Sequence, residues 1–409
     1  MNILVLNAGS SSQKSTLYRV DAPPSLLPPA PLWAAEIDWS GELPSSATLR
    51  VRTATGATLE RPLPVDRQAA LAAMLETLWS GPMRVIAGPG EIGGVGHRVV
   101  HGGLDYEESV RITPRVTAAI ARLAAIAPEH NPAALAGIEV VTRVLGAGVP
   151  QVAVFDTAFH AHMPLAAAVY PGPYAWFEQG IRRFGFHGIS HQYCAERAAQ
   201  LLGRDLGALR LITCHLGNGC SLAAIAGGRS VDTTMGFTPM EGLMMGSRSG
   251  SVDPGILTYL LRERGVSGES LDRTLNHDSG LKGISGISSD MRDVMAARTA
   301  GDARAVLAFD MFVHRLRLGI GAMLAALGGV DALVFAGGIG EHVPEVRAGA
   351  CEAFGYMGLR LDDARNAQSP HDANIAASDS TVPVFVIQTQ EDWMIARECW
   401  RVFGATQST

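Results

Sequence analysis

Short apolar runs separated by glycine-containing turns open the chain and recur in its second half. Residues 3–6 predict a strand, residues 15–20 predict its partner in a hairpin, and residues 33–39 predict a third strand. The same order recurs in three later segments, 209–215, 220–225 and 229–232. Two copies of strand, glycine turn, strand, turn and strand predict a duplicated domain.

Apolar residues at helical spacing follow each copy of this pattern. Two helices are predicted, with the buried faces Ala70, Leu71, Met74, Leu75 and Leu78 in the first and Leu307, Phe312, Leu316, Ile320 and Leu324 in the second. Further apolar strands are predicted at 95–100, 152–155, 333–335 and 384–387. Strands that alternate with helices are typical of sheets covered by helices, so the predicted fold class is α/β.

The length of the chain predicts two domains. A chain of 409 residues exceeds the size at which one hydrophobic core keeps growing. We expect an N-terminal domain at 1–156 and a C-terminal domain at 157–390. The last helix has no strand after it, so segment 391–409 is expected to pack back onto the N-terminal domain and complete it. The proline-rich stretch 22–31 is expected to be a surface loop, and its role stays open.

Composition excludes several classes of protein. The net charge of −6, from 33 basic and 39 acidic residues without a long basic run, argues against nucleic-acid binding. The five cysteines are scattered and form no C-x-x-C pair, which suits a reducing compartment. Neither a signal peptide nor an apolar run of roughly 20 residues is present. We therefore expect a cytoplasmic protein with no membrane partner.

Three glycine-rich turns, each after an apolar strand, are candidates for binding phosphate. They are residues 7–12, 217–219 and 337–341, and Lys14 adds a positive charge near the first. Glycine lets backbone N–H groups approach phosphate oxygens closely. Any one of these segments is more simply explained as an ordinary turn, but three of them together favour a nucleotide site. The chain has no P-loop and lacks the full dinucleotide-binding spacing.

Six longer motifs are spread along the chain. They are Asn-Ala-Gly-Ser-Ser-Ser at 7–12, Gly-His-Arg-Val-Val-His-Gly-Gly at 96–103, Phe-Asp-Thr-Ala-Phe-His at 155–160, Phe-Gly-Phe-His-Gly at 184–188, His-Leu-Gly-Asn-Gly at 215–219 and Gly-Phe-Thr-Pro-Met-Glu-Gly at 236–242. Together they resemble the signatures of acetate kinases, and the resemblance spans nearly the whole chain. The resemblance implies the ribonuclease H-like fold shared by sugar kinases, Hsp70 and actin. In that fold two duplicated domains enclose an ATP cleft, and the family usually forms a homodimer.

The resemblance also implies an activity and its cofactors. The expected reaction is reversible phosphorylation of acetate by ATP to give acetyl phosphate, through direct in-line transfer to the carboxylate. ATP and ADP are the expected co-substrates, with Mg²⁺ as the metal and Mn²⁺ as an alternative. Residues 1–156 with 391–409 would hold the acyl substrate and the phosphates, and residues 157–390 would bind the nucleotide.

The same resemblance assigns roles to single residues. The catalytic residues would be Asp156, His187 and Arg248, and the acyl substrate would contact Arg98, Val100, Phe186 and Pro239. The nucleotide would contact Lys14, His215, Leu216, Gly217, Asn218, Gly219, Asp290, Met291, Arg292, Gly337, Gly338, Ile339, Gly340 and Glu341. Asn7 and Glu391 would be associated with the metal.

Physical chemistry supports cations in these roles and limits the role of Asp156. Phosphoryl transfer spreads negative charge over three equatorial oxygens, and the guanidinium fork matches both carboxylate and phosphoryl geometry. Without the resemblance, Arg98 and Arg248 would be read as surface arginines, His187 as a structural histidine and Asp156 as a helix cap. A small carboxylic acid is already ionised at neutral pH and needs no general base. We therefore expect Asp156 to organise Mg²⁺ and its waters.

One position in the expected acyl pocket departs from the family. Glu129 stands before His-Asn-Pro, where acetate kinases usually carry leucine. Its carboxylate would face solvent, pair with His130 or an arginine, or adapt the pocket to an acid with a polar or cationic tail, in that order of preference. Gln390 and Asp392 beside Glu391 are also atypical and would alter metal handling.

Two alternatives to acetate phosphorylation stay open. A kinase for propionate or butyrate would use the same chemistry, and one methylene gives only about 1–3 kcal/mol of discrimination. A nucleotide-binding regulator on the same fold would transfer no phosphoryl group. The retention of Arg98, His187 and Arg248 speaks against the regulator, because a protein that only senses ATP needs no cations on the acceptor side. The physiological direction is not predicted by these residues.

Overall fold

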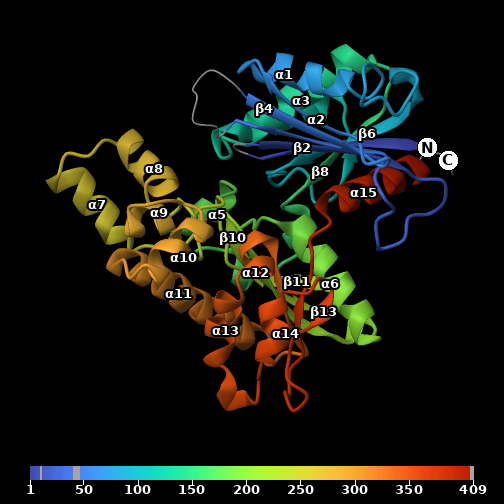
Figure 1. Cartoon of the computed structure of the whole chain (residues 1–409). Helices are drawn as coiled ribbons and strands as arrows, with labels where there is room; N and C mark the ends of the chain where they lie inside the picture. The colour runs from blue at the N-terminus through green and yellow to red at the C-terminus, as the bar shows by residue number, and fades with distance from the viewer. Residues whose placement is uncertain (10–11, 40–46, 406–409) are drawn as a thin grey trace. The chain divides into compact units, whose positions relative to one another are not determined.

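The computed structural model describes residues 1–9, 12–39 and 47–405, which form two compact units (Figure 1). Unit 1 comprises Met1–Ala158 and Gln390–Thr409, and unit 2 comprises Phe159–Thr389. Each unit is built on its own mixed sheet. Ser10 and Ser11 of the first predicted phosphate loop lie outside the described residues, as do residues 406–409 of the last predicted segment.

The sheet of unit 1 has the strand order β5-β4-β3-β2-β1-β6-β8-β7. Its strands are β1 Asn2–Ala8, β2 Ser12–Arg19, β3 Trp33–Asp38, β4 Ala47–Thr53, β5 Thr58–Leu63, β6 Ile92–Val99, β7 Val110–Arg111 and β8 Gln151–Phe155. Each pair of neighbours from β1 to β5 is antiparallel, whereas β6 runs parallel to both β1 and β8. The three predicted N-terminal strands are thus confirmed.

Helices cover both faces of this sheet (Figure 1). They are α1 Arg67–Glu76, α2 Pro114–Arg122, α3 Asn131–Leu145 and α15 Glu391–Ala405, with short 3₁₀ turns at Pro89–Glu91 and Leu123–Ala125. Helix α15 lies on the opposite face from α1 and α3 and contacts β1, β6 and β8. A Cβ at Gly96 of β6 would lie 2.5 Å from Ile395 and from Cys399 of α15, so this close approach requires glycine.

The proline-rich stretch 22–31 forms neither helix nor strand, as predicted. It is fixed to the last helix, because the indole Nε1 of Trp393 donates a hydrogen bond of 3.0 Å to the carbonyl of Ser25. The Trp393 ring also meets Tyr18 of β2 edge to face, with 5.1 Å between ring centres. The loop therefore covers part of the interface between α15 and the sheet.

The sheet of unit 2 has the strand order β11-β10-β9-β12-β14-β13. Its strands are β9 Arg210–Leu216, β10 Cys220–Ala226, β11 Arg229–Thr233, β12 Ala332–Ala336, β13 Ala373–Asn374 and β14 Val384–Val386. Strands β9, β10 and β11 are antiparallel, and β12 runs parallel to both β9 and β14. In each unit the first strand has an antiparallel partner on one side and a parallel partner on the other, as the predicted duplication requires.

Unit 2 carries most of the helices. They are α4 Leu165–Ala168, α5 Tyr174–Glu178, α6 Gly188–Leu202, α7 Pro254–Glu263, α8 Gly268–His277, α9 Gly280–Ser285, α10 Met291–Thr299, α11 Ala303–Leu327, α12 Gly337–His342, α13 Pro344–Glu352 and α14 Asp363–Gln368. Short 3₁₀ turns lie at Leu206–Ala208 and Gly355–Met357, and a third, Ala158–His160, spans the boundary between the units.

Both predicted helices form, but one predicted face needs correction. The five predicted positions around α1 are buried, whereas Leu307 of α11 is 51% exposed and Leu324 only partly buried. The spacing from Leu307 to Phe312 does not match whole helical turns, so Leu307 falls off the buried stripe. Phe309 and Val313 take its place in the core.

The predicted glycine-rich turn at 337–341 is also wrong in part, because these residues begin helix α12 directly after β12. Gly337 adopts a φ of 75°, and a Cβ there would lie 2.8 Å from the carbonyl oxygen of Leu216. The glycine therefore allows a strand-to-helix junction in which the backbone passes close to β9.

Candidate functional site

The end of β6 in unit 1 carries a buried ion pair between two predicted site residues. Arg98 Nε lies 3.0 and 3.1 Å from the two carboxylate oxygens of Asp156, and Nη2 lies 2.5 Å from Oδ2. The Asp156 side chain is 2% exposed and that of Arg98 13%. Burial alone would lower the pKa of Arg98, but the charges of Asp156 and Glu391 outweigh it and raise that pKa. The guanidinium is thus permanently charged and held in one orientation.

Asn7, at the end of β1, links this pair to the start of α15. Its Oδ1 accepts a hydrogen bond of 3.4 Å from Arg98 Nη1, and its Nδ2 donates to Asp392 Oδ1 at 2.9 Å and to Glu391 Oε2 at 3.4 Å. The other Asp392 oxygen accepts a hydrogen bond of 2.7 Å from Thr16. The structure thus brings together four predicted residues, Arg98, Asp156, Asn7 and Glu391, and the atypical Asp392. It adds Thr16, to which the sequence had assigned no role.

The oxygen atoms of this cluster suit a hard divalent cation. No group of three or more His, Cys, Asp or Glu side chains in the described ranges is arranged to hold a metal ion. Mg²⁺ needs no such group, because it keeps several waters and takes one or two carboxylates together with substrate phosphates. Asn7, Glu391 and Asp392 offer that kind of incomplete oxygen set.

Lys14, Val100 and Glu129 are the other residues of unit 1 that the sequence singled out. Lys14 stands opposite Asn7 in the β1–β2 pair, and its side chain is exposed. Val100 is buried directly after β6. Glu129 is half-buried in the turn before α3. The buried Asn131, the first residue of α3, holds the segment after β6, because its amide group makes hydrogen bonds of 3.2 and 3.3 Å with the backbone of His101.

In unit 2, His187 occupies a strained backbone position at the start of helix α6. Its φ of 56° lies in the left-handed region, which is unfavourable for a residue with a side chain. The neighbouring carbonyl of Phe186 is held by the buried His160, whose Nε2 donates a hydrogen bond of 3.1 Å. Burial lowers the pKa of His160 to about 4, so this ring is neutral at pH 7. His160 therefore fixes the turn that presents Phe186 and His187.

Hydrogen bonds and ring contacts fix the side chain of His187. Its Nδ1 lies 2.9 Å from Ser221 Oγ, and Ser221 Oγ lies 2.7 Å from His191 Nε2. The ring stacks on that of His215, with 4.2 Å between ring centres. Nδ1 of His215 is in turn held by Ser190 Oγ at 2.8 Å. Of these residues, the sequence motifs had pointed to His187 and His215, whereas Ser190, His191 and Ser221 had no assigned role.

Arg248 lies on a turn that the backbone of helix α9 holds in place. Leu281 and Lys282 donate backbone hydrogen bonds to Met245 and Gly246 of this turn. A Cβ at Gly280 would lie 2.2 Å from the carbonyl oxygen of Met245, so the turn can sit on α9 only because this residue is glycine. Arg248 Nη1 donates a hydrogen bond of 3.2 Å to the carbonyl of Pro239.

His187 and Arg248 flank the same hairpin. A Cβ on Gly219, in the turn between β9 and β10, would lie 3.3 Å from the His187 ring and 3.7 Å from Arg248 Nη1. The nearby Gly246 donates a backbone hydrogen bond of 3.0 Å to the carbonyl of Asn218. The predicted residues His187, Arg248, Asn218 and Gly219 of unit 2 are therefore neighbours.

The loop 236–242, which contains Pro239, is anchored by a polar cluster absent from the predicted site. Arg183 Nη2 lies 2.7 Å from Glu241, and its Nη1 donates hydrogen bonds of 3.0 Å to the carbonyls of Thr234 and Met235. The Tyr170 hydroxyl donates a hydrogen bond to the other oxygen of Glu241. These contacts fix the backbone that carries Pro239.

A buried arginine shapes the predicted nucleotide segment 337–341. Arg347, with no exposed surface, donates hydrogen bonds to the carbonyls of Gly340 at 2.8 Å and Glu341 at 2.9 Å, and its other donors bind Asn366 and Ser369. The carboxylate of Glu341 accepts a hydrogen bond of 3.0 Å from the backbone N–H of Gly337, and burial raises its pKa. Glu341 thus closes the segment onto itself.

The third predicted nucleotide segment, 290–292, begins helix α10. Asp290 caps the helix by accepting a hydrogen bond of 2.8 Å from the backbone N–H of Arg292. The Arg292 side chain returns to the same carboxylate, which lowers the pKa of Asp290. Met291 is buried and Arg292 is exposed, so these neighbours offer different surfaces to a ligand.

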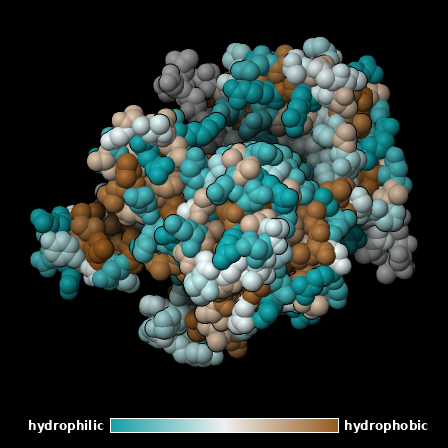
Figure 2. Space-filling view, turned by 60° about the horizontal axis from the view of Figure 1, so that its bottom comes forward, coloured by the Kyte–Doolittle hydropathy of each residue, from teal (hydrophilic) through white to brown (hydrophobic). Residues whose placement is uncertain are grey.

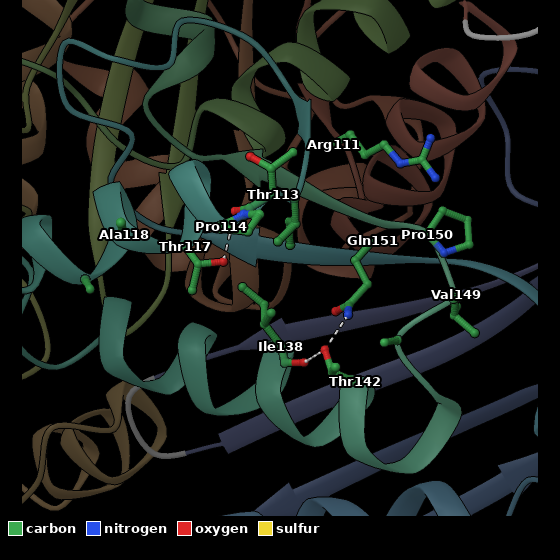
Figure 3. Close-up of a pocket in the computed structure, with 14 residues that line it drawn as sticks. Arg111, Thr113, Pro114, Thr117, Ala118, Ile138, Thr142, Val149, Pro150 and Gln151 are labelled. Carbon is green, nitrogen blue, oxygen red and sulfur yellow. Dashed lines mark hydrogen bonds between the residues drawn. The ribbon is translucent and has the colours of Figure 1, made fainter.

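A cavity of about 670 Å³ in unit 1 stands apart from the cluster around Arg98. Helices α2 and α3 and the segment before β8 line this open cavity, and Arg111, Thr117, Ile138, Thr142 and Gln151 lie around it (Figure 3). None of the predicted site residues lines this cavity. Gln151 connects it to the core of the unit, because its Oε1 lies 2.7 Å from Nε2 of the buried His97.

Comparisons with known proteins agree over nearly the full length of the chain. The Acetokinase family matches residues 2–397. An acetate kinase from Gloeobacter violaceus is 62% identical over 406 residues, which cover 98% of this chain and 99% of the relative. An acetate kinase from a Cyanothece species is 60% identical over 403 residues, 98% of each chain.

Solved structures give the same result. A Porphyromonas gingivalis acetate kinase superposes with a TM-score of 0.88 at 39% identity, and a Francisella tularensis propionate kinase superposes with the same score at 35% identity. In both cases 98% of this chain and 99% of the other are covered.

Proposed function

Because the chain belongs to the acetokinase family, we propose that it catalyses the reversible, ATP-dependent phosphorylation of acetate to acetyl phosphate. It is thus a phosphotransferase with a carboxyl group as acceptor. The predicted family is confirmed, as is the α/β fold with a duplicated sugar kinase and actin-like architecture. The roles of single residues, the metal and the oligomer are further parts of the proposal.

The observation that carries the chemical proposal is the buried, fixed guanidinium of Arg98. A carboxylate substrate needs a cation that stays charged, and the Asp156 pair keeps Arg98 charged and oriented. Asp156 then acts by holding Arg98 as well as by the predicted organisation of the metal's waters. Val100 of unit 1 and Phe186 and Pro239 of unit 2 are the proposed apolar contacts of the acyl group.

His187 and Arg248 are the proposed donors to the transferring phosphoryl group. Their shared position beside Gly219 supports this role, since a turn without a side chain leaves room for phosphate oxygens. Lys14 and the segments 215–219, 290–292 and 337–341 are the proposed nucleotide contacts. ATP and ADP would be the co-substrates.

Mg²⁺, with Mn²⁺ as an alternative, is the proposed metal. Asn7 and Glu391 would hold it together with substrate oxygens, and Asp392 orients Asn7. When bound, the ion neutralises charge on the phosphates.

A hydroxamate assay of the native protein and Glu129→Leu tests both the activity and the acid. ATP and Mg²⁺ are supplied with acetate, propionate, butyrate, glycine or succinate. We expect acetate to be the best substrate and Glu129→Leu to change little, because the half-buried Glu129 is predicted to face solvent. Poor acetate turnover that Glu129→Leu restores would instead mean that the protein phosphorylates another acid. The 35% identical propionate kinase makes propionate the first alternative.

The regulator hypothesis makes a different prediction for Arg248. If the protein transfers phosphoryl groups as proposed, Arg248→Ala abolishes phosphorylation of ADP by acetyl phosphate while ATP still binds. Unchanged turnover by this variant would contradict the assigned mechanism. Failure of the native protein to turn over any acid while it binds ATP would favour the regulator.

Helix α7 is the proposed contact surface of a homodimer. None of its residues is buried, and Ile256, Tyr259 and Leu261 expose between 42% and 50% of their surface. Apolar side chains gather over the end of unit 2 that carries this helix (Figure 2). A helix this apolar and uncovered is typical of a protein–protein interface, and a second copy is the partner expected from the family.

Light scattering after size exclusion tests the dimer. Ile256→Glu combined with Tyr259→Glu should shift the mass toward the monomer, whereas Leu104→Glu, at a 58% exposed position of unit 1, should leave it unchanged. A native monomer would contradict the proposal.

No helix among the described residues is long and apolar enough to cross a membrane. The proposed cytoplasmic location agrees with five buried cysteines that form no disulfide.

A further inference from the structure

A buried chain of hydrogen bonds runs from the sheet of unit 2 to His187. Thr213 Oγ1 lies 2.7 Å from His191 Nδ1, His191 Nε2 lies 2.7 Å from Ser221 Oγ, and Ser221 Oγ lies 2.9 Å from His187 Nδ1. Thr213, Ser221 and His191 are all at most 1% exposed. The chain ends at His187, the proposed donor to the transferring phosphoryl group.

Every member of this chain can donate or accept, so it has two self-consistent directions. In the first, Thr213 donates to His191 Nδ1, His191 Nε2–H donates to Ser221, and the Ser221 hydroxyl donates to His187 Nδ1. A neutral His187 then carries its proton on Nε2. In the second direction all three hydrogen bonds are reversed, and His187 carries a proton on Nδ1.

Thr213 distinguishes the two directions. In the first, its hydroxyl proton is used in the bond to His191. In the second, the hydroxyl only accepts and its proton needs another acceptor, but Thr213 Oγ1 makes no other hydrogen bond among the residues that the structure describes. A buried donor without an acceptor is costly, so the first direction is favoured.

The state of His191 is consistent with this choice. Burial, with smaller effects from His160 and His215, lowers its pKa well below the usual value, so its ring is neutral and has one N–H. A neutral His187 with its proton on Nε2 has its donor on the ring nitrogen that the chain does not use.

We propose that Thr213, His191 and Ser221 are positioning residues that set the tautomer of His187, so that Nε2–H is the donor to the transferring phosphoryl group. The inference rests on the proposed role of His187. Thr213 is buried at the far end of the chain and reaches His187 only through two intermediate residues. Its effect on catalysis is therefore separable from binding.

Two substitutions at Thr213 separate the hydroxyl from the packing. Thr213→Val keeps the branched shape and removes the hydroxyl, whereas Thr213→Ser keeps the hydroxyl and removes a methyl group. We expect Thr213→Val to lower kcat about tenfold with little change in either KM, an effect of the size seen when partners that orient metal ligands are removed. Thr213→Ser should stay close to the native kcat. An equal loss in both variants would mean a packing role and would overturn the inference.

The tautomer can be measured directly. In protein labelled with ¹⁵N at histidine, long-range ¹H–¹⁵N spectra show which ring nitrogen carries the proton, and the His187 signals are identified by their absence in His187→Gln. The native protein should show the Nε2–H form, and Thr213→Val should show a mixture of both forms. Urea midpoints of each variant verify folding. A native Nδ1–H form, or an unchanged tautomer in Thr213→Val, would overturn the inference.

These measurements also separate this inference from the proposed function. Turnover of acetate by a native protein whose His187 carries the proton on Nδ1 would refute the tautomer and leave the function standing. A native protein with the expected tautomer and its expected change in Thr213→Val, but without turnover of any acid, would refute the function and leave the control of the tautomer standing.

Discussion

The two units hold their proposed catalytic side chains with different kinds of hydrogen bond. Around Arg98 in unit 1 the roles are fixed, because a guanidinium can only donate and the carboxylates of Asp156 and Asp392 can only accept. The amide of Asn7 between them has one orientation that serves both neighbours. Around His187 in unit 2 the partners are imidazole rings and hydroxyl groups, and each can exchange its role.

A second chain in unit 1 shows the same fixed character. Gln151 Nε2 donates to Thr142 Oγ1 at 2.8 Å, and Thr142 donates to the carbonyl of Ile138 (Figure 3). Gln151 Oε1 accepts from His97 Nε2. An amide nitrogen can only donate and an amide oxygen can only accept. The hydrogen bonds of this chain can therefore point in one direction only. It ends at His97, the neighbour of Arg98 on β6.

The difference matches the two tasks that we propose. The carboxylate of the acyl substrate is an anion before the reaction, so a rigid, permanently charged partner suits it. The transferring phosphoryl group changes its charge distribution during the reaction, and a donor with a defined tautomer must stay aligned with it. Around Arg98 in unit 1 each hydrogen bond therefore has only one possible donor, whereas around His187 in unit 2 the surroundings select the donor. Both arrangements hold a proposed catalytic side chain in one orientation.

Breaking the ion pair between Arg98 and Asp156 in unit 1 should have the largest effect. Arg98→Leu leaves the Asp156 carboxylate buried without its cation, which should cost about 3–5 kcal/mol of unfolding free energy and abolish turnover. Urea unfolding and the hydroxamate assay measure the two effects. Arg98→Leu combined with Asp156→Leu removes both charges and should recover much of the stability without recovering turnover. Stability equal to the native value in the single variant would show that the pair is not energetically coupled.

The sequence predicted the strands of unit 1 better than it predicted the side-chain contacts around Asn7. The apolar runs that became β1, β2 and β3 were readable because burial on a sheet requires them. Asp392 was noticeable only as an atypical neighbour of Glu391, and its bonds to Asn7 and Thr16 depend on the packing of α15 against β1. No local pattern encodes a contact between residues at opposite ends of the chain.

The same limit applies to unit 2. The motif that contains His187 could be recognised, but Thr213 and Ser221 are ordinary strand residues until β9 and β10 pair and α6 packs on them. His191 follows His187 at the spacing of one helical turn, the one local signal of their proximity. Arg347 gave no signal, because its partners are backbone carbonyls of α12 and groups of α14.

A smaller effect is expected from Asp392. Asp392→Leu removes the acceptor of both Asn7 and Thr16 and should lower kcat/KM about 10- to 100-fold, with a raised requirement for Mg²⁺. Asp392→Asn should lose much less, because its carbonyl can accept from Asn7 while the Thr16 hydroxyl turns to accept from its amide. Titration of Mg²⁺ in the hydroxamate assay measures both. Equal losses in the two variants would mean that the charge of Asp392, and not its hydrogen bonds, is needed.

The smallest expected effect concerns the pH dependence of the unfolding free energy. It tests the hydrogen-bonded chain from Thr142 through Gln151 to His97, the neighbour of Arg98. Burial lowers the pKa of His97 to about 4, so between pH 6.5 and 4 the unfolded chain binds a proton at this residue that the folded protein does not. The unfolding free energy should therefore fall with decreasing pH, by about 1.4 kcal/mol per pH unit for each such histidine. His97→Gln should reduce this slope by about one proton, whereas His314→Gln on the exposed side of α11 serves as the surface control. Urea unfolding at several pH values measures the slopes. An unchanged slope in His97→Gln would mean that His97 binds a proton in the folded protein as readily as in the unfolded chain, and would contradict the lowered pKa.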